Sequence, residues 1–160
     1  LSLVPLILLY VSVLNNFDFN YMGIKYFSFN FSYILIFYYS VKKSGSLGYV
    51  FIFVAGLFND VVIGTPIGIS SLMFLILCGS AAYLRNITLR PSLMKDWIFF
   101  LFTILILNFL LFSLLVLIFN FEIEYFDQLI NVMFTFLLYL LFAYIFDKFE
   151  KFSIGTSNER

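Results

Sequence analysis

Histidine is absent from this 160-residue chain, and cysteine occurs once, as Cys78 within an apolar run. Without histidine or a second thiol, the chain can build neither a Cys/His metal site nor a disulfide framework. These absences exclude most hydrolytic, redox and zinc chemistry, so we expect no enzymatic activity, no cofactor and no bound metal. Charge is scarce too: 11% of the residues are charged, and the formal net charge is zero, which indicates no nucleic-acid partner.

The rest of the chain is overwhelmingly apolar, with hydrophobic residues making up 63% of it. A soluble domain carries roughly half apolar and about a quarter charged residues, so this inventory cannot cover a water-soluble surface. The apolar runs are continuous and do not alternate with polar residues, which favours helices over strands. The sequence therefore predicts an all-α integral membrane protein.

The apolar runs predict about six transmembrane helices, at residues 1–14, 26–41, 47–64, 67–84, 97–119 and 129–146. The chain opens on Leu1 rather than Met, which indicates either a non-standard start or a few missing N-terminal residues. The first run is shorter than the roughly 20 residues of a full span, which favours a truncated first helix. Residues 1–147 form one polytopic transmembrane domain in this interpretation. Residues 148–160 form a cytoplasmic tail of mixed charge, and the stretch from Asp147 onward is the segment that we expect to be disordered.

The basic residues predict the orientation of these helices. The chain has nine Lys and Arg residues, and in the six-span arrangement only Lys25 falls on the side opposite to the others, which are Lys42, Lys43, Arg85, Arg90, Lys95, Lys148, Lys151 and Arg160. Lys and Arg in short loops mark the cytoplasmic side. We therefore place both termini in the cytoplasm, with residues 15–25, 64–68 and 120–128 facing outward.

A polar interruption stands out in the third apolar run, the stretch GLFNDVVIGTPIG from Gly56 to Gly68. Gly56, Asp60 and Gly64 recur every four residues and so share one helix face, where small residues let helices approach closely in lipid. Pro66 stops a helix, and Gly64 and Gly68 permit a tight reversal. The stretch predicts a close-packed helical hairpin with Asp60 just below its outer tip.

Asp60 lies about 25 Å from Lys43 along a helix, near the outer boundary of a hydrocarbon core about 30 Å thick. Arg85 is about 27 Å away along the next helix, so no basic residue reaches the carboxylate within the membrane. Two interpretations remain open: Asp60 is a helix-end residue wetted by the outer interface, or it contacts a partner protein, which the missing counter-charge slightly favours. Its donors within the chain would be backbone amides at the start of the fourth helix or the hydroxyls of Thr65, Ser70 or Ser71.

The order of these residues resembles the rod-shape-determining protein MreD family. That family shows a Gly-Leu-x-x-Asp segment, a Gly-Ser/Thr-Pro-Leu-Gly turn and a helix that ends in Arg. The matching positions here are Gly56, Leu57, Asp60, Gly64, Thr65, Pro66, Gly68 and Arg85. Tyr38-Tyr39 before Lys42-Lys43 is similar to the family's aromatic pair before a basic turn. This chain departs from the pattern at Ile67, where Leu is commoner, and at Ser70, where many members carry His.

The resemblance implies a non-enzymatic subunit of the bacterial cell-wall elongation machinery that maintains rod shape. It implies an inner-membrane location and association with the MreC scaffold and, through it, with MreB, RodA and a penicillin-binding transpeptidase. It also implies a fold similar to the vitamin-binding S-components of energy-coupling-factor transporters. A small-molecule-binding subunit of a membrane transporter is the alternative, although the outward loops lack Trp, His and a dense polar cluster suited to a vitamin.

Polar residues inside the other apolar runs are predicted to join helices. Asn108 falls near the midplane of the fifth run, where a buried amide usually bonds a neighbouring helix. Ser71, Cys78 and Ala82 share a face of the fourth run and predict a packing seam. Asn131 and Thr135 are neighbours on the sixth run and predict a further contact between helices.

Overall fold

The structure is a computed structural model that describes residues 3–15, 29–43 and 47–157. Its elements are α1 (Leu3–Asn15), α2 (Phe31–Lys42), α3 (Tyr49–Ile63), α4 (Ile69–Ile87), α5 (Leu93–Leu117) and α6 (Tyr125–Ser157). These described ranges contain helices and no strand, which confirms the all-α prediction. Three of the helices, α4, α5 and α6, are long and apolar enough to cross a membrane.

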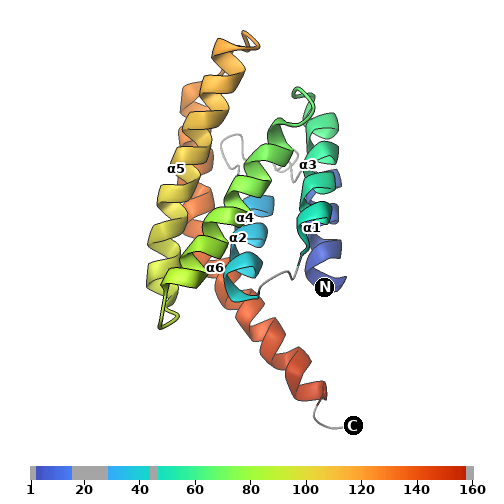
Figure 1. Cartoon of the computed structure of the whole chain (residues 1–160), viewed down its shortest axis with the longest axis vertical. Coiled ribbons are helices and arrows are strands. Elements are labelled where there is room, and N and C mark those ends of the chain that lie inside the picture. The colour runs from blue at the N-terminus through green and yellow to red at the C-terminus, as the bar shows by residue number, and fades with distance from the viewer. Residues whose placement is uncertain (1–2, 16–28, 44–46, 158–160) are drawn as a thin grey trace, which may run out of the picture.

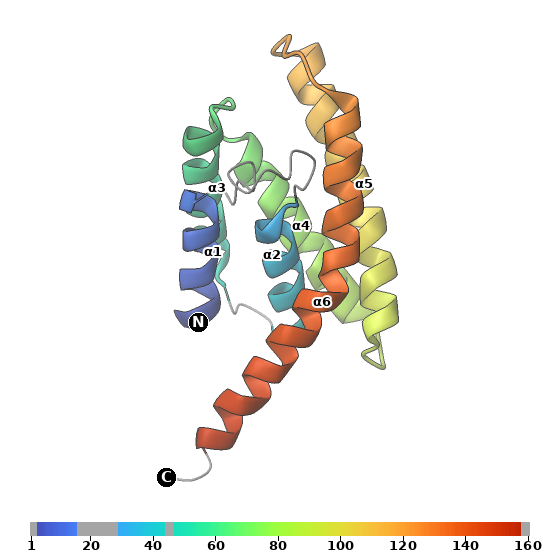
Figure 2. The same ribbon diagram turned by 180° about the vertical axis from the view of Figure 1, so that it is seen from behind.

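The helices form a bundle in which α2 and α4 occupy the middle (Figures 1 and 2). Helices α1 and α3 pack together on one side, and α5 and α6 form an antiparallel pair on the other. Helix α4 contacts α2, α3 and α5, so it connects the two sides. The six-span count and the likeness to S-components remain predictions, because length and composition qualify only three helices as spans.

Helix α2 is the centre of the core. Its 12 residues extend about 18 Å, which is shorter than a hydrocarbon core of about 30 Å. Every residue from Ser32 to Ser40 is buried, as expected for a helix that is apolar on all faces. The predicted second span began at residue 26, but residues 26–28 lie outside the described ranges. The observed helix begins at Phe31 because the Asn30 side chain caps it, accepting a bond from the Tyr33 amide at 3.3 Å.

Large apolar side chains are exposed along α5 and α6. Phe102, Phe109 and Leu129 expose 60%, 71% and 61% of their surface. Exposed apolar surface of this extent marks a membrane or a protein interface. Together with the apolar length of α4, α5 and α6, it indicates a protein embedded in a membrane.

The tail predicted to be disordered is helical as far as Ser157, so that prediction is wrong. Helix α6 continues through the polar segment because Asp147 is held on both sides: the Tyr38 hydroxyl donates to its carboxylate, and the Lys42 ammonium lies 3.2 Å from the same oxygen. Opposite charges four residues apart, at Asp147 and Lys151, also favour a helix. The polar loop predicted at residues 85–96 is likewise shorter, since α4 ends at Ile87 and α5 begins at Leu93.

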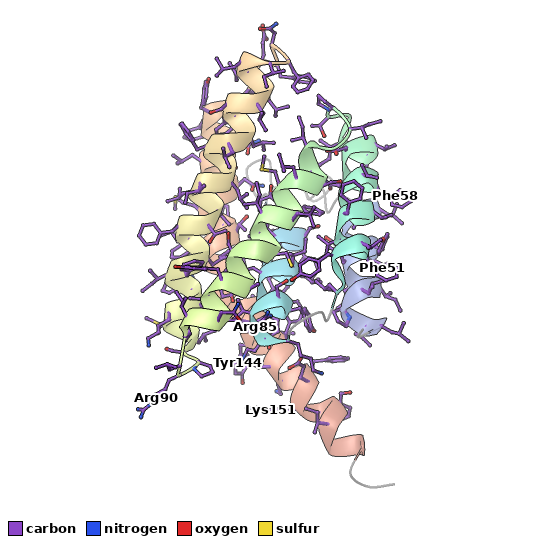
Figure 3. All side chains as sticks on the ribbon, viewed as in Figure 1. Phe51, Phe58, Arg85, Arg90, Tyr144 and Lys151 are labelled. Carbon is purple, nitrogen blue, oxygen red and sulfur yellow. The ribbon has the colours of Figure 1, made fainter. Side chains whose placement is uncertain are left out.

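Both chain ends lie toward the same end of the bundle, and the α3–α4 turn lies at the other (Figures 1 and 2). Arg85, Arg90 and Lys151 lie toward the end that holds the termini (Figure 3). This distribution agrees with the predicted clustering of basic residues on one side. Which side faces the cytoplasm remains a prediction.

Cysteine labelling tests that orientation. In a Cys78→Ala background, we expect Glu124→Cys to react with a membrane-impermeant maleimide in intact cells. Glu124 is exposed between α5 and α6, and the connection of these two helices lies at the end of the bundle opposite the chain termini. Arg90→Cys, exposed at the basic end, should react only after the cells are permeabilised. Labelling of Arg90→Cys but not Glu124→Cys in intact cells would reverse the orientation.

Candidate functional site

The turn between α3 and α4 is built around two glycines in left-handed conformations. Gly64 ends α3 with φ of 82°, and its amide donates to the Asp60 carbonyl oxygen at 2.9 Å. Gly68 precedes α4 with φ of 106°. Residues with a Cβ rarely adopt such angles, which explains glycine at both positions. Pro66 lies between them and its carbonyl accepts from the Ile69 amide at 3.4 Å. The predicted tight reversal is confirmed.

Asp60 lies inside this turn and is completely buried. Its Oδ1 accepts from the Thr65 hydroxyl at 2.8 Å and from the Ser70 amide at 3.0 Å, and its Oδ2 accepts from the Gly68 amide at 2.7 Å. The amides of Gly68 and Ser70 belong to the start of α4, where the first turn of a helix has N–H groups without partners inside the helix. A carboxylate from α3 therefore caps α4 and is stabilised by the positive end of its dipole.

The predicted donors of Asp60 are confirmed for the Thr65 hydroxyl and the backbone amides at the start of α4. Ser70 contributes its amide to Asp60, while the Ser71 hydroxyl donates instead to the Phe53 carbonyl at 2.8 Å. The interpretation of Asp60 as wetted by the outer interface is wrong, because the start of α4 folds over the carboxylate and leaves it 0% exposed. Both carboxylate oxygens accept bonds within the hairpin, which gives Asp60 a structural role there. A contact between Asp60 and a partner protein stays a prediction.

Gly56 marks the closest approach of α3 and α4. A Cβ built on Gly56 would lie 2.4 Å from the Ser71 Cα and 2.5 Å from its backbone nitrogen. Real Cβ atoms do not approach backbone so closely, so only glycine fits at this crossing. The predicted close packing of the hairpin is confirmed, with Gly56 against Ser71 as its tightest point.

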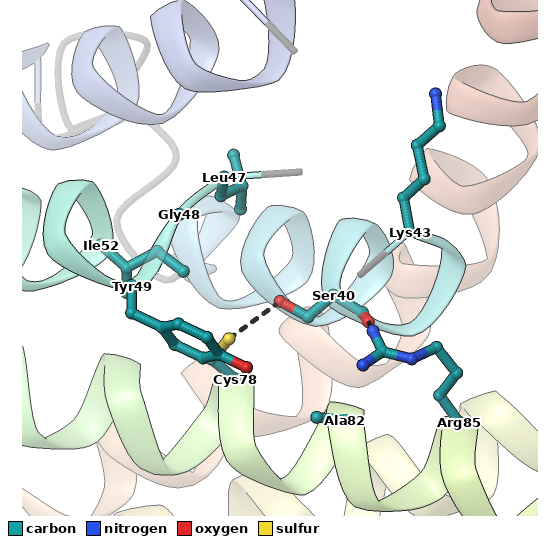
Figure 4. Close-up of a pocket in the computed structure, with 9 residues that line it drawn as sticks. All are labelled: Ser40, Lys43, Leu47, Gly48, Tyr49, Ile52, Cys78, Ala82 and Arg85. Atoms are coloured by element: carbon teal, nitrogen blue, oxygen red, sulfur yellow. Dashed lines mark hydrogen bonds between the residues drawn. The ribbon is translucent and has the colours of Figure 1, made fainter. Parts of the chain in front are cut away.

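Arg85 lies toward the other end of α4, far along the helix from Asp60. One of its guanidinium nitrogens donates to the Ser40 carbonyl at 2.6 Å, which satisfies a carbonyl in the last turn of α2. The Ser40 hydroxyl donates in turn to the Cys78 sulfur at 3.3 Å (Figure 4). The cavity beside these residues measures about 10 Å³, which is room for one water at most. Arg85 and Cys78 therefore connect α4 to α2, and the described residues around them leave no room for a ligand larger than water.

Among the described residues, Asn108 does not bond a neighbouring helix as predicted. Its Nδ2 donates at 2.8 Å to the carbonyl of Ile104, one turn earlier in α5. The same side chain lines a cavity of about 260 Å³. Amide and hydroxyl side chains contribute much of the wall, and they are Ser12, Asn30, Ser32, Tyr33, Asn59, Thr65, Ser70, Asn108, Gln128 and Asn131. Thr65 and Ser70 also belong to the cradle of Asp60, so the cavity borders the α3–α4 turn.

Sequence reasoning missed this polar cluster because its members come from all six helices and the segments next to them. The sequence does carry one signal for the cluster, which is the number of amide side chains in the outer half of the predicted spans. Of these, only Asn108 and Asn131 are predicted from the sequence to make contacts within the bundle. Thr135 does join two helices as predicted: its hydroxyl oxygen accepts from the backbone N–H of Asn30, the cap of α2, at 2.9 Å. Trp97, at the start of α5, also joins helices, donating to the Phe136 carbonyl of α6 at 2.8 Å.

Comparisons of the chain with protein-family models, with curated proteins and with solved structures found no match. Among the described residues, no group of three or more His, Cys, Asp or Glu side chains could hold a metal ion. The candidate site therefore consists of two adjoining parts, the hairpin turn centred on Asp60 and the polar cavity beside it.

Proposed function

We propose that the chain is a non-enzymatic membrane subunit of the bacterial cell-wall elongation complex that maintains rod shape. The observation that supports this proposal is the hairpin turn. The resemblance to the MreD family is carried by residues that each have a defined structural role in this compact unit, namely Gly56, Asp60, Gly64 and Gly68. A close helix crossing, an internal cap and two left-handed residues together explain why such residues recur at this spacing.

In this proposal the protein resides in the inner membrane with both termini in the cytoplasm. It acts by holding the MreC scaffold and, through it, MreB, RodA and a penicillin-binding transpeptidase. A rigid hairpin is suited to this task, because a preorganised surface loses little conformational freedom when a partner binds. The exposed apolar faces of α5 and α6 supply surface for lipid or for a membrane-embedded partner.

Depletion tests the proposal in cells. We expect rod-shaped cells that lose this protein to become round within a few generations, and we expect re-expression of the wild-type chain to restore rods. A variant with an exposed carboxylate neutralised, Glu122→Gln, serves as the matched control and should restore rods as well. Depleted cells that keep their rod shape would refute the proposal.

A second candidate, a small-molecule-binding subunit of a membrane transporter, is favoured by the polar cavity. The dense polar cluster that the outward loops lack is assembled instead from side chains of several helices. The two candidates predict different gene neighbours: a filament and scaffold gene for the first, and an energising ATPase for the second.

A further inference from the structure

The polar cavity is unusual for the interior of a membrane-embedded helix bundle. Its wall combines five amide side chains, those of Asn30, Asn59, Asn108, Gln128 and Asn131, with five side chains that carry a hydroxyl. Polar side chains within apolar helices are costly, and they face a bundle interior or a water-filled cavity where they have partners. A cavity of about 260 Å³ is much larger than one water requires and approaches the size of small-molecule pockets.

Two of these amides, Asn59 and Asn108, have hydrogen-bonding capacity beyond the bonds that they make among the described residues. Asn59 uses its Nδ2 to donate to the Ser70 hydroxyl at 2.8 Å, and Asn108 uses its Nδ2 to donate to the Ile104 carbonyl at 2.8 Å. An amide side chain offers two donors and a carbonyl oxygen with two lone pairs, so the bonds made within the described part of the chain leave a donor and an acceptor on each of the two for a guest. Since Thr65 and Gln128 also line the cavity, it extends toward the end of the bundle that holds the α3–α4 turn.

The wall also restricts the charge of a guest. No Lys, Arg, Asp or Glu stands among the described residues that line the cavity. A charged molecule would lose its hydration there without gaining an opposite charge, which is strongly unfavourable. A neutral molecule with hydroxyl or amide groups would instead exchange its bonds to water for bonds to the amides, while Phe31, Met73 and Leu115 would cover its apolar part.

We propose that this cavity binds a small uncharged molecule that carries several hydroxyl or amide groups. The proposal rests on the cavity alone and on neither of the two proposed functions. In an elongation subunit, binding of such a ligand would make the conformation of the adjoining hairpin turn depend on a solute on the same side of the membrane. In a transporter subunit, it would be the cargo.

Equilibrium binding to the full chain in lipid nanodiscs tests this proposal. The probe is radiolabelled N-acetylglucosamine, a single uncharged ring that carries both hydroxyls and an amide. Glucosamine and glucuronic acid serve as cationic and anionic counterparts that are no larger than the probe. We expect saturable binding of the neutral probe and at least tenfold weaker binding of both charged sugars, because the described residues of the wall offer no counter-charge.

Two nearly isosteric variants locate the binding. Asn108→Leu and Gln128→Met remove amides while keeping side-chain volume. Among the described residues, Asn108 bonds only within its own helix, so its substitution breaks no hydrogen bond to another helix there. Each variant should weaken binding by roughly three- to tenfold, the effect of one lost hydrogen bond. Ser113→Ala, on α5 away from the cavity, should bind like the wild type. Thermal unfolding of each variant confirms that it is folded.

Three results would overturn the proposal. The first is the absence of saturable binding by the folded wild type, which would indicate a cavity filled with water only. The second is equal binding of the neutral and charged sugars. The third is unchanged binding in both folded amide variants.

Discussion

Gly56→Ala should lower the melting temperature of the purified protein by roughly 6–12 °C. The added methyl group would lie 2.4 Å from the Ser71 Cα, and backbone cannot turn aside as a flexible side chain can. Helices α3 and α4 must therefore separate along the hairpin. Overpacking of a close contact costs about 1–3 kcal/mol, and this contact belongs at the upper end of that range. Gly56→Leu should be more severe and should lower the amount of protein in the membrane.

Gly79→Ala is the matched control for this experiment. Gly79 lies on α4 like Ser71, but a Cβ built there meets nothing within 4 Å. Alanine is also the better helix former, by up to about 1 kcal/mol. The control variant should melt at the wild-type temperature or slightly above it. Equal melting temperatures for Gly56→Ala and Gly79→Ala would contradict the close crossing of α3 and α4.

Asp60→Asn should destabilise the protein by about 2–3 kcal/mol, although asparagine has nearly the same size. Both oxygens of Asp60 accept bonds from N–H or O–H donors, so an amide NH₂ group in place of either oxygen faces a donor. The buried amide of Gly68 or Ser70 would lose its acceptor, and a lost bond to a charged group is worth about 1.5–3 kcal/mol. Asp60→Ala removes all acceptors and should be worse. Thermal unfolding in detergent measures both effects.

Asp127→Asn provides the control, because Asp127 is exposed and its neutralisation should leave the melting temperature unchanged. The order expected is wild type and Asp127→Asn together, then Asp60→Asn, then Asp60→Ala. A folded Asp60→Asn protein with wild-type stability that no longer binds its partners would show the carboxylate to be a partner site after all, against its burial within the hairpin.

The hairpin could be predicted from the sequence because its signals are local. Gly64 and Gly68 flank Pro66 within a few residues, and Gly56 precedes Asp60 by one helical turn, so ordinary helix geometry places them. The burial of Asp60 could not be predicted in the same way. It depends on how far the first turn of α4 folds over the end of α3, and this is decided by the left-handed conformation at Gly68.

The centre of the fold was also beyond sequence reasoning. The run that contains α2 looks like an ordinary transmembrane span, but an apolar run does not reveal whether it faces lipid or other helices. The cavity was missed for a related reason, since Asn30, Asn59 and Asn108 are far apart in the sequence. The helical tail was missed because its charges were interpreted as solvated chain, whereas Asp147 is fixed by Tyr38 and Lys42 from α2.

Affinity purification of the tagged chain from growing cells, followed by mass spectrometry, tests the central functional claim most directly. The wild-type protein and Gly79→Ala should both enrich a scaffold protein and a wall synthase over an unrelated polytopic membrane protein purified in parallel. Gly56→Leu should enrich less of both for each molecule recovered, because its hairpin is displaced. Enrichment of a transport ATPase with neither scaffold nor synthase would contradict the elongation function and leave the carrier function in its place.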